Sequence, residues 1–193
     1  SMQTYDFIVV GSGSAGSVVA ERLSANGRYS VMVLEAGGTD MRFYVQMPLG
    51  YGKTFFDPAV NWNYKAEPDP GLAGNADHWP RGKLLGGSSS INGHVVTRGQ
   101  PEGYDAWAAE GNPGWDFESL LPYFRKLEDA TGCDDPARGH GGPMTVKRSQ
   151  GLDELTKLMV KAAEECGIPF NDDPNGRNVE GIGMVQRAIR SGR

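Results

Sequence analysis

The sequence is short of cysteine, of histidine and of long apolar runs. It holds 2 cysteines and 3 histidines, and neither Cys133 nor Cys166 lies in a CxxC or mixed Cys/His pattern, so we expect no metal site and no oxidising compartment. No stretch approaches the ~18 apolar residues that a membrane-spanning helix requires, and no leader with a basic start and an apolar centre precedes the first predicted strand. We therefore expect a soluble, cytoplasmic protein without a membrane partner.

An excess of positive charge is also missing. Lysine and arginine number 19 against 24 acidic residues, for a formal net charge of −5, which gives no support for a nucleic-acid partner. Glycine is abundant at 28 residues, and proline reaches 12. This composition is typical of many turns and long ordered loops around a limited set of regular elements.

The rest of the chain is organised around a stretch near its beginning. Residues 7–10 form a short, largely β-branched apolar run, which predicts a strand covered on both faces. The sequence G-S-G-S-A-G follows at 11–16, and the pattern after it predicts a helix over 14–25 and a second strand over 30–34. The order strand, glycine turn, helix and strand predicts a βαβ unit.

The spacing of this turn predicts an adenine-dinucleotide site. Gly11 allows a tight turn, Gly13 lets a pyrophosphate approach the backbone, and Gly16 lets the helix pack against the strand. The free amides of the first helical turn can bind an anion. Glu35 lies near the roughly 20-residue offset at which a carboxylate accepts hydrogen bonds from a ribose, and it would repel a 2′-phosphate. FAD and NAD both fit this unit, and a βαβ turn without a ligand is the alternative.

Two later stretches add to this hypothesis. Between 41 and 79 no helical or strand period persists, but frequent aromatic residues indicate an ordered loop. Its N-W-N-Y cluster at 61–64 either covers a planar cofactor or anchors the loop to the core. The block at 82–93, rich in glycine and serine, can wrap a phosphate or the polar edge of a ring, although such a segment is also typical of a linker.

The second half predicts further regular elements. We expect helices over 116–129, with Asp116 as the N-cap, and over 153–166, with a strand over 143–147. Cys166 is expected to be a small buried thiol on the apolar side of its helix. His94 either hydrogen-bonds a bound cofactor or substrate or is satisfied by backbone groups, and the other two histidines receive no role.

Several motifs together resemble one enzyme family. The block G-K-L-L-G-G-S-S-S-I-N-G at 82–93, the earlier G-S-G-S-A-G and the E-A-G-G at 35–38 are similar to segments of the glucose/methanol/choline oxidoreductases, a family of FAD-dependent alcohol oxidases and dehydrogenases. The resemblance continues through R-G at 98–99, G-N-P-G-W at 111–115, L-P-Y-F at 121–124 and G-H-G-G-P at 139–143. It covers essentially the whole chain, and the last apolar stretch, at 183–189, resembles a strand of the family's substrate domain.

The resemblance implies where FAD would bind. The pyrophosphate and the adenosine ribose would contact Gly11, Gly13, Ser14, Ala15, Gly16 and Glu35, and the pyrophosphate and flavin ring would be surrounded by Ser88, Asn92, Gly93 and Val95. Ile91 stands where some members carry a flavin-linked histidine, so FAD should be non-covalent. Val96 departs from the aromatic residue or alanine often found at its position. No residue here matches the family's catalytic histidine, so we assign no catalytic residue.

The fold class expected is α/β: a Rossmann-like FAD-binding βαβ unit with long ordered loops, plus the start of an α+β substrate domain. We place an incomplete FAD-binding domain at 1–100 and the helical extension with the start of the substrate domain at 101–193. The expected function is the N-terminal part of an enzyme that oxidises the CH–OH group of a small-molecule alcohol, with a second polypeptide carrying the C-terminal remainder. The alternatives are a truncated, non-catalytic FAD-binding module and a nicotinamide-dependent dehydrogenase, which leaves the 82–93 block unexplained.

Overall fold

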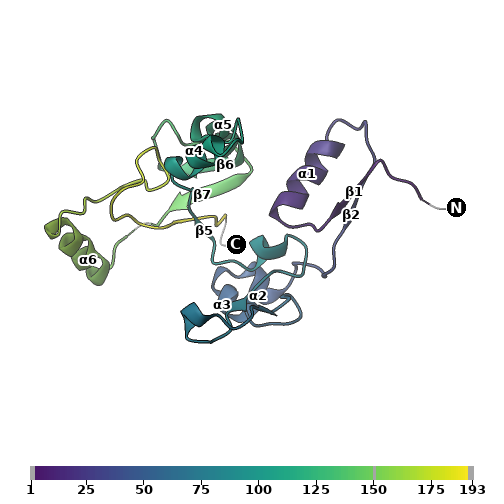
Figure 1. The fold of residues 1–193 in the computed structure, drawn as a ribbon, viewed down its shortest axis with the longest axis horizontal. Coiled ribbons are helices and arrows are strands. Elements are labelled where there is room, and N and C mark those ends of the chain that lie inside the picture. The colour runs from purple at the N-terminus through teal and green to yellow at the C-terminus, as the bar shows by residue number, and fades with distance from the viewer. Residues whose placement is uncertain (1–2, 150, 191–193) are drawn as a thin grey trace. The chain divides into compact units, whose positions relative to one another are not determined.

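The chain folds into two compact units in the computed structural model. Residues 3–149 and 151–190 are described, and the first unit extends through Gly93 while the second begins at His94 (Figure 1). The predicted α/β class is confirmed, because strands and helices occur in both units. The predicted domain division after residue 100 lies slightly beyond the division between the compact units, and it stays a prediction.

The first unit opens with the predicted strand, helix and strand. β1 (Phe7–Val10) pairs in parallel with β2 (Val31–Leu34). α1 (Ser14–Ser24) connects them and packs along them, as Figure 1 shows. The expectation of cover on both faces is not met within the described residues, since Ile8 is 59 % exposed and Val10 84 %. One helix on a two-stranded sheet leaves much of the apolar surface of the strands open.

The long segment after β2 contains short elements that sequence periodicity did not reveal. None exceeds 4 residues, too short for a 3.6-residue or two-residue period to register: α2 (Phe43–Gln46), η1 (Pro48–Gly50), α3 (Tyr51–Thr54), β3 (Tyr64–Lys65), η2 (Pro70–Leu72) and β4 (His78–Trp79). β3 and β4 pair antiparallel. The predicted ordered loop is therefore built around a small core, in which Val45 packs on the buried Val60, Leu84 and Ile91. η3 (Gly87–Ser90) completes the unit.

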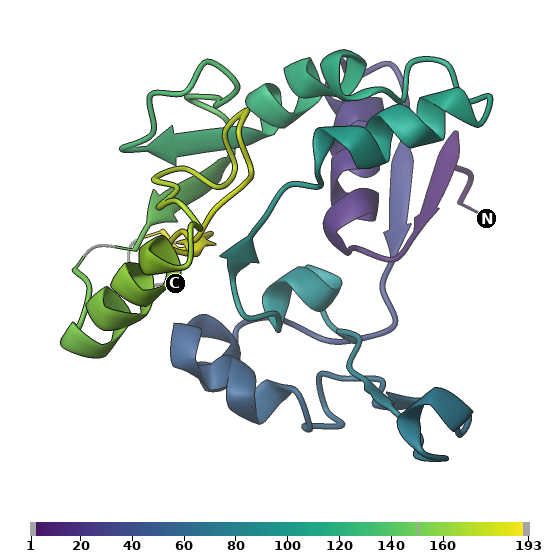
Figure 2. The ribbon, with the colours of Figure 1, turned by 60° about the vertical axis from the view of Figure 1, so that its left-hand side comes forward.

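The second unit combines helices with a mixed sheet. Its strands run in the order β5-β8-β7-β6, with β6 and β7 parallel and the other pairs antiparallel. Its elements are β5 (Val95–Val96), α4 (Pro101–Ala109), α5 (Phe117–Leu127), β6 (Glu128–Thr131), β7 (Met144–Arg148), α6 (Glu154–Glu165) and β8 (Gln186–Arg187). Phe117, Leu121 and Ala137 form its apolar cluster. α6 lies at the margin of the unit in Figures 1 and 2.

Helix caps account for the accuracy of two predictions. Asp116 accepts a hydrogen bond from the Ser119 amide (2.9 Å), and Asp153 does the same for Thr156 (2.9 Å). Both helices therefore begin where predicted. The end predicted for the first was wrong, because the chain turns into β6 at Glu128.

Two further expectations for the second unit fail. α4 was not predicted, and the strand expected over 183–189 is reduced to β8. Cys166 is exposed, contrary to expectation, and Cys133 is the buried thiol. The helical face that carries Leu155 (68 % exposed) and Leu158 (63 % exposed) is not covered by the described residues, which explains the error at Cys166.

A buried ionic network lies at the centre of the second unit. The Glu128 carboxylate accepts hydrogen bonds from Arg138 Nε (3.0 Å) and Nη2 (3.0 Å) and from the Gly139 amide (2.7 Å), and it also pairs with Arg98. Arg138 reaches Asp173 through Nη1 (2.6 Å). The side chains of Arg138 and Glu128 are 0 % and 3 % exposed, so their charges are desolvated and depend on each other.

Candidate functional site

The glycine turn between β1 and α1 has the geometry that its spacing predicts. Gly11 has a φ of +90°, and its amide donates to the Leu34 carbonyl at 2.7 Å. A Cβ on Gly16 would lie 2.0 Å from the Gly11 oxygen, so close packing requires glycine there. A Cβ on Gly13 would meet nothing closer than 3.9 Å. The protein's own packing thus does not require glycine at Gly13, which is consistent with a requirement set by a ligand.

Glu35 joins the two loops that follow β1 and β2. Its Oε2 accepts hydrogen bonds from the Ser12 amide (2.9 Å) and hydroxyl (2.8 Å), and its Oε1 accepts from the Gly37 amide (2.9 Å). Burial acts to raise the pKa of the Glu35 carboxyl, but the hydrogen bonds from Ser12 and Gly37 outweigh it, so the pKa lies below its usual range. A carboxylate has about four lone-pair positions. The ionised group therefore keeps capacity for a further donor such as a ribose hydroxyl.

The second glycine-rich block folds against the first. The Gly86 amide donates to the Ser12 carbonyl at 3.1 Å, and Gly87 has a φ of +57°. A Cβ on Gly87 would stand 2.9 Å from the Cα of Gly13, and one on Gly82 would stand 2.2 Å from the Gly87 carbonyl carbon. The block is thus not a linker: it meets a loop far away in the sequence, and at Gly82 and Gly87 the packing leaves no room for a side chain.

A cleft of about 380 Å³ opens beside these two loops. Its lining residues come from the ends of β1 and β2, the loop after β2, β3 and the second glycine block: Val10, Gly11, Gly13, Leu34, Glu35, Ala36, Trp62, Tyr64, Arg81, Gly82, Gly87 and Ser88. Ligands of α/β sheets bind outside the carboxyl ends of the strands, where this cleft lies.

The cleft contains some of the predicted residues and adds others. Gly11, Gly13, Glu35 and Ser88 line it. Ser14, Ala15 and Gly16 lie next to it in the first turn of α1, Asn92 and Gly93 follow η3, and Val95 opens β5 in the second unit. Sequence reasoning did not single out Ser12, Arg81 or Gly87, although Gly87 lies in the 82–93 block that it assigned to a phosphate or the edge of a ring. The close approach that selects glycine at Gly87 depends on tertiary contacts that no local pattern reveals.

The N-W-N-Y cluster anchors its loop, and its aromatic residues line the cleft. Asn61 is 2 % exposed; its Nδ2 donates to the Phe55 carbonyl (2.8 Å), and its Oδ1 accepts from the Arg81 amide (2.9 Å). The Trp62 and Tyr64 rings stack with centroids 5.9 Å apart and line the cleft. Asn61 anchors the loop to the core, and this anchoring holds two aromatic faces at the cleft.

The chemistry of this cleft suits the adenosine diphosphate part of a dinucleotide. Glycines without side chains allow a pyrophosphate to approach, and the N-cap of α1, Gly13, makes no side-chain hydrogen bond to the first helical turn, which leaves its amides for an anion. The ionised carboxylate of Glu35 and the stacked rings of Trp62 and Tyr64 also line the cleft. The residues present thus fit FAD or NAD.

Comparison with known proteins identifies the family of this chain. Residues 5–193 match the family described as GMC oxidoreductase. The chain belongs to the GMC oxidoreductases. It is 42 % identical over 188 residues to an oxygen-dependent choline dehydrogenase of Rhizobium etli, covering 97 % of this chain and 34 % of that protein. A relative of the same description from Sinorhizobium fredii is 43 % identical, with the same coverage. The chain therefore spans about a third of the length of these relatives.

Solved structures of GMC relatives have the same fold. Pyridoxine 4-oxidase from Mesorbium loti superposes with a TM-score of 0.91 at 32 % identity, over 98 % of this chain and 38 % of that one. An FAD-dependent oxidoreductase from Chaetomium thermophilum gives a TM-score of 0.86 at 31 % identity, over 97 % and 34 %. A formate oxidase gives 0.84 at 27 %, over 96 % and 34 %. The family resemblance deduced from the motifs is confirmed.

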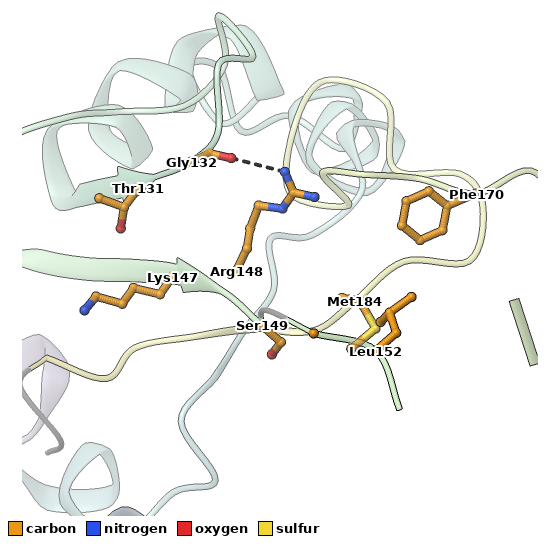
Figure 3. Close-up of a pocket in the computed structure, with 9 residues that line it drawn as sticks. Thr131, Gly132, Lys147, Arg148, Ser149, Leu152, Phe170 and Met184 are labelled. Carbon is orange, nitrogen blue, oxygen red and sulfur yellow. Dashed lines mark hydrogen bonds between the residues drawn. The ribbon is translucent and has the colours of Figure 1, made fainter. Parts of the chain in front are cut away.

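A larger cleft of this GMC chain, about 880 Å³, lies in the second unit and contains none of the predicted cofactor residues. Figure 3 shows the apolar side chains of Leu152, Phe170 and Met184 on one side of it, while Arg148 points toward Gly132 and donates to its carbonyl at 3.2 Å. It lacks the glycines and free helix amides of the first cleft. Nothing in its lining indicates dinucleotide chemistry.

The histidines and possible ligating groups can now be placed. His78 Nε2 lies 3.2 Å from Asn63 Oδ1 and His140 Nδ1 lies 2.9 Å from the Ala130 carbonyl oxygen. His94 has a φ of +60°, and its chemical role stays a prediction. Within residues 3–149 and 151–190 no cluster of His, Cys, Asp and Glu could hold a metal ion. The helices in those ranges are also too short or too polar to cross a bilayer.

Proposed function

We propose that this chain forms the FAD-binding N-terminal part of a GMC oxidoreductase that oxidises the CH–OH group of a small-molecule alcohol. The cleft at the ends of β1 and β2 carries the proposal, because two glycine loops, an ionised glutamate and stacked aromatic rings line one space. FAD is favoured over a nicotinamide dinucleotide, because family relatives are named as FAD-dependent and the second glycine block lines the same cleft. When bound, FAD supplies the redox chemistry by accepting the hydride at N5.

The residues of this chain bind and orient that cofactor. The first glycine loop and the start of α1 would hold the pyrophosphate, and Glu35 would accept a hydrogen bond from the ribose. Asn92, Gly93 and Val95 contribute around the pyrophosphate and ring, as the family motif implies. Attachment is non-covalent. Ile91, at the position of the tethering histidine in some members, has no nucleophile and is 3 % exposed in the core with Val60 and Leu84.

The remainder of the enzyme is proposed to be a further stretch of polypeptide, present as part of a longer chain or as a separate one. Val10 is 84 % exposed and β1 pairs only with β2 among the described strands, and such an apolar open edge is a liability unless other residues cover it. The relatives named for choline and pyridoxine, both alcohols, support the substrate class. The compartment we propose is the cytoplasm.

Release of the cofactor tests the proposal. The protein in its natural length is purified, denatured and analysed by mass spectrometry for FAD and for any second polypeptide. Release of FAD in stoichiometric amount is expected. Release of a nicotinamide nucleotide, or of none, would refute the assignment.

A glycine variant tests the site itself. Gly13→Val is expected to abolish FAD retention by blocking the pyrophosphate, while the fold persists because φ at Gly13 is −71° and a Cβ there finds no atom closer than 3.9 Å. Gly52→Ala is the control, because its Cβ points into open space in α3 (Tyr51–Thr54). A flavin-loaded Gly13→Val protein would contradict the motif assignment.

A further inference from the structure

Asn175 holds a backbone segment that is distant in sequence. Its Oδ1 accepts a hydrogen bond from the Arg98 amide at 2.7 Å, and its Nδ2 donates to the Val96 carbonyl at 3.0 Å. These partners lie 77 and 79 residues away in the chain. Asn175 is 2 % exposed, so these bonds form away from water, where an unmet polar group is costly. The carboxamide therefore clamps the backbone on both sides of Thr97.

The clamp is itself fixed by the buried network. Asn175 Nδ2 also donates to Gln186 Oε1 (2.9 Å), which accepts a second bond from Arg138 Nη1 (2.8 Å). Asp173 Oδ1 accepts from Gln186 Nε2 at 2.7 Å. Because Gln186 is 0 % exposed and both ends of its amide are engaged, the orientation of the Asn175 carboxamide is determined. A rigid side chain can position a backbone to within fractions of an ångström.

The clamped segment begins at a residue with a positive φ. His94 has a left-handed φ of +60°, a conformation that is uncommon in non-glycine residues, although histidine adopts it more often than most. The Ala188 amide donates to the His94 carbonyl at 2.8 Å, and Val96 pairs with Gln186 in the sheet. Residues 94 to 98 are thus bound at the His94 and Val96 carbonyls and at the Arg98 amide by residues between 175 and 188. The segment is therefore held at three backbone groups by a part of the chain that is distant in sequence.

We propose that Asn175 is a positioning residue for the flavin: it fixes the backbone from His94 to Arg98 and thereby sets Val95. The inference rests on the proposed function, in which Val95 lies at the cofactor. Asn175 does not touch the cofactor. It acts by fixing the backbone of β5, and with it the position of Val95. Loss of the clamp frees the segment, so that the flavin environment changes even where the fold persists.

Two variants separate the clamp into its parts. Asn175→Ala removes both hydrogen bonds to the segment, and amide exchange at Arg98 and at Ala188 is expected to accelerate about tenfold, as for the loss of one net hydrogen bond. Asn175→Asp keeps the acceptor for the Arg98 amide but loses the donor to Val96. It should protect Arg98 as in the unaltered protein and accelerate exchange at Ala188 alone, and it serves if Asn175→Ala does not fold.

The decisive readout is the flavin, measured in the protein of natural length. Both variants are expected to change the shape of the bound-flavin absorption band, and Asn175→Ala to raise the FAD Kd about tenfold. Asn178→Ala, an exposed asparagine of the same loop, should leave the spectrum, the Kd and the exchange rates unchanged. Wild-type spectrum and Kd in folded Asn175 variants would overturn the inference, leaving Asn175 a core hydrogen-bonding residue only.

Failure of the proposed function has a different signature. A parent protein that binds no FAD would refute that function and the flavin role of Asn175 together. Exchange at Arg98 and Ala188 would then still decide whether Asn175 holds the segment.

Discussion

The two units of this chain are stabilised in opposite ways. The second unit buries charge: Arg98, Glu128 and Arg138 lie in its interior with side chains at most 6 % exposed. The first unit leaves apolar strands open, and its Ser12 and Glu35 hydrogen-bond each other at the margin of a cleft. In the second unit the buried ionic network fixes one arrangement of the loops. In the first unit the glycines and the half-buried Glu35 leave an open cleft. The difference separates residues that hold the fold from residues that leave room for a ligand.

The largest expected effect lies in the buried network. Glu128→Ala leaves two buried guanidinium groups without their carboxylate, and the free energy of unfolding is expected to fall by about 3 to 5 kcal/mol. A denaturant titration measures it. Glu118→Ala is the matched control, because it removes an exposed ion pair with Arg177 and should change little. Equal losses in the two variants would show that the network adds nothing beyond a surface pair.

The next effect concerns the cleft. Glu35→Ala is expected to raise the FAD Kd about tenfold to a hundredfold, the range for losing a charge-assisted hydrogen bond. Ser12→Ala loses only the hydroxyl bond to Glu35 and keeps the amide bond, so a smaller rise is expected. Flavin fluorescence titration of both variants gives the comparison. An unchanged Kd for Glu35→Ala would remove the ribose assignment.

A pH dependence follows from the same carboxylate. The pKa of Glu35 is lowered in the folded state, below the value of about 4.3 of an unfolded glutamate. The ionised group therefore contributes its stabilisation fully above the unfolded pKa and loses it as pH falls through the folded pKa. Unfolding midpoints recorded from pH 6 downward should decline more steeply below about pH 4.3 in the parent protein than in Glu35→Gln. If the midpoints of the parent and of Glu35→Gln fell in parallel with pH, the hydrogen bonds from Ser12 and Gly37 would not lower the pKa of Glu35.

The smallest expected effect on stability concerns the cysteines. Alkylation of the exposed Cys166 should leave the unfolding midpoint unchanged. Cys133 is 4 % exposed, and burial followed by the negative charge of Asp173 raises the pKa of its thiol, so little thiolate forms. It should react only when the second unit opens. Mass spectrometry of the labelled native protein should find one modified cysteine, and rapid double labelling would contradict the burial.

Local chemistry predicted those features that depend on nearby residues. The turn at Gly11 and the helix starts after Asp116 and Asp153 follow from backbone preferences and capping, which act over a few residues. The family motifs led correctly to the GMC oxidoreductases. The position of Glu35 after β2 was also deduced, although its hydrogen bonds to Ser12 were not.

Tertiary contacts account for what the sequence did not reveal. The meeting of Gly13 with Gly87 and the clamp made by Asn175 join segments that no periodicity connects. Cys166 was placed in the core because its helix has an apolar face, but in the described structure that face has no covering partner. A pattern predicts which side of a helix is apolar and leaves open what covers it.

The contact between the two glycine loops also bears on how this chain is made. The Ser12 carbonyl accepts from the Gly86 amide as well as from Ser17 Oγ, and Gly13 packs against Gly87, so the first loop gains its contacts with the second only after a much later part of the polypeptide has left the ribosome. The βαβ segment emerges early but remains an unfinished nucleotide cradle during synthesis. Under the proposed function, FAD binding would follow translation of the second loop.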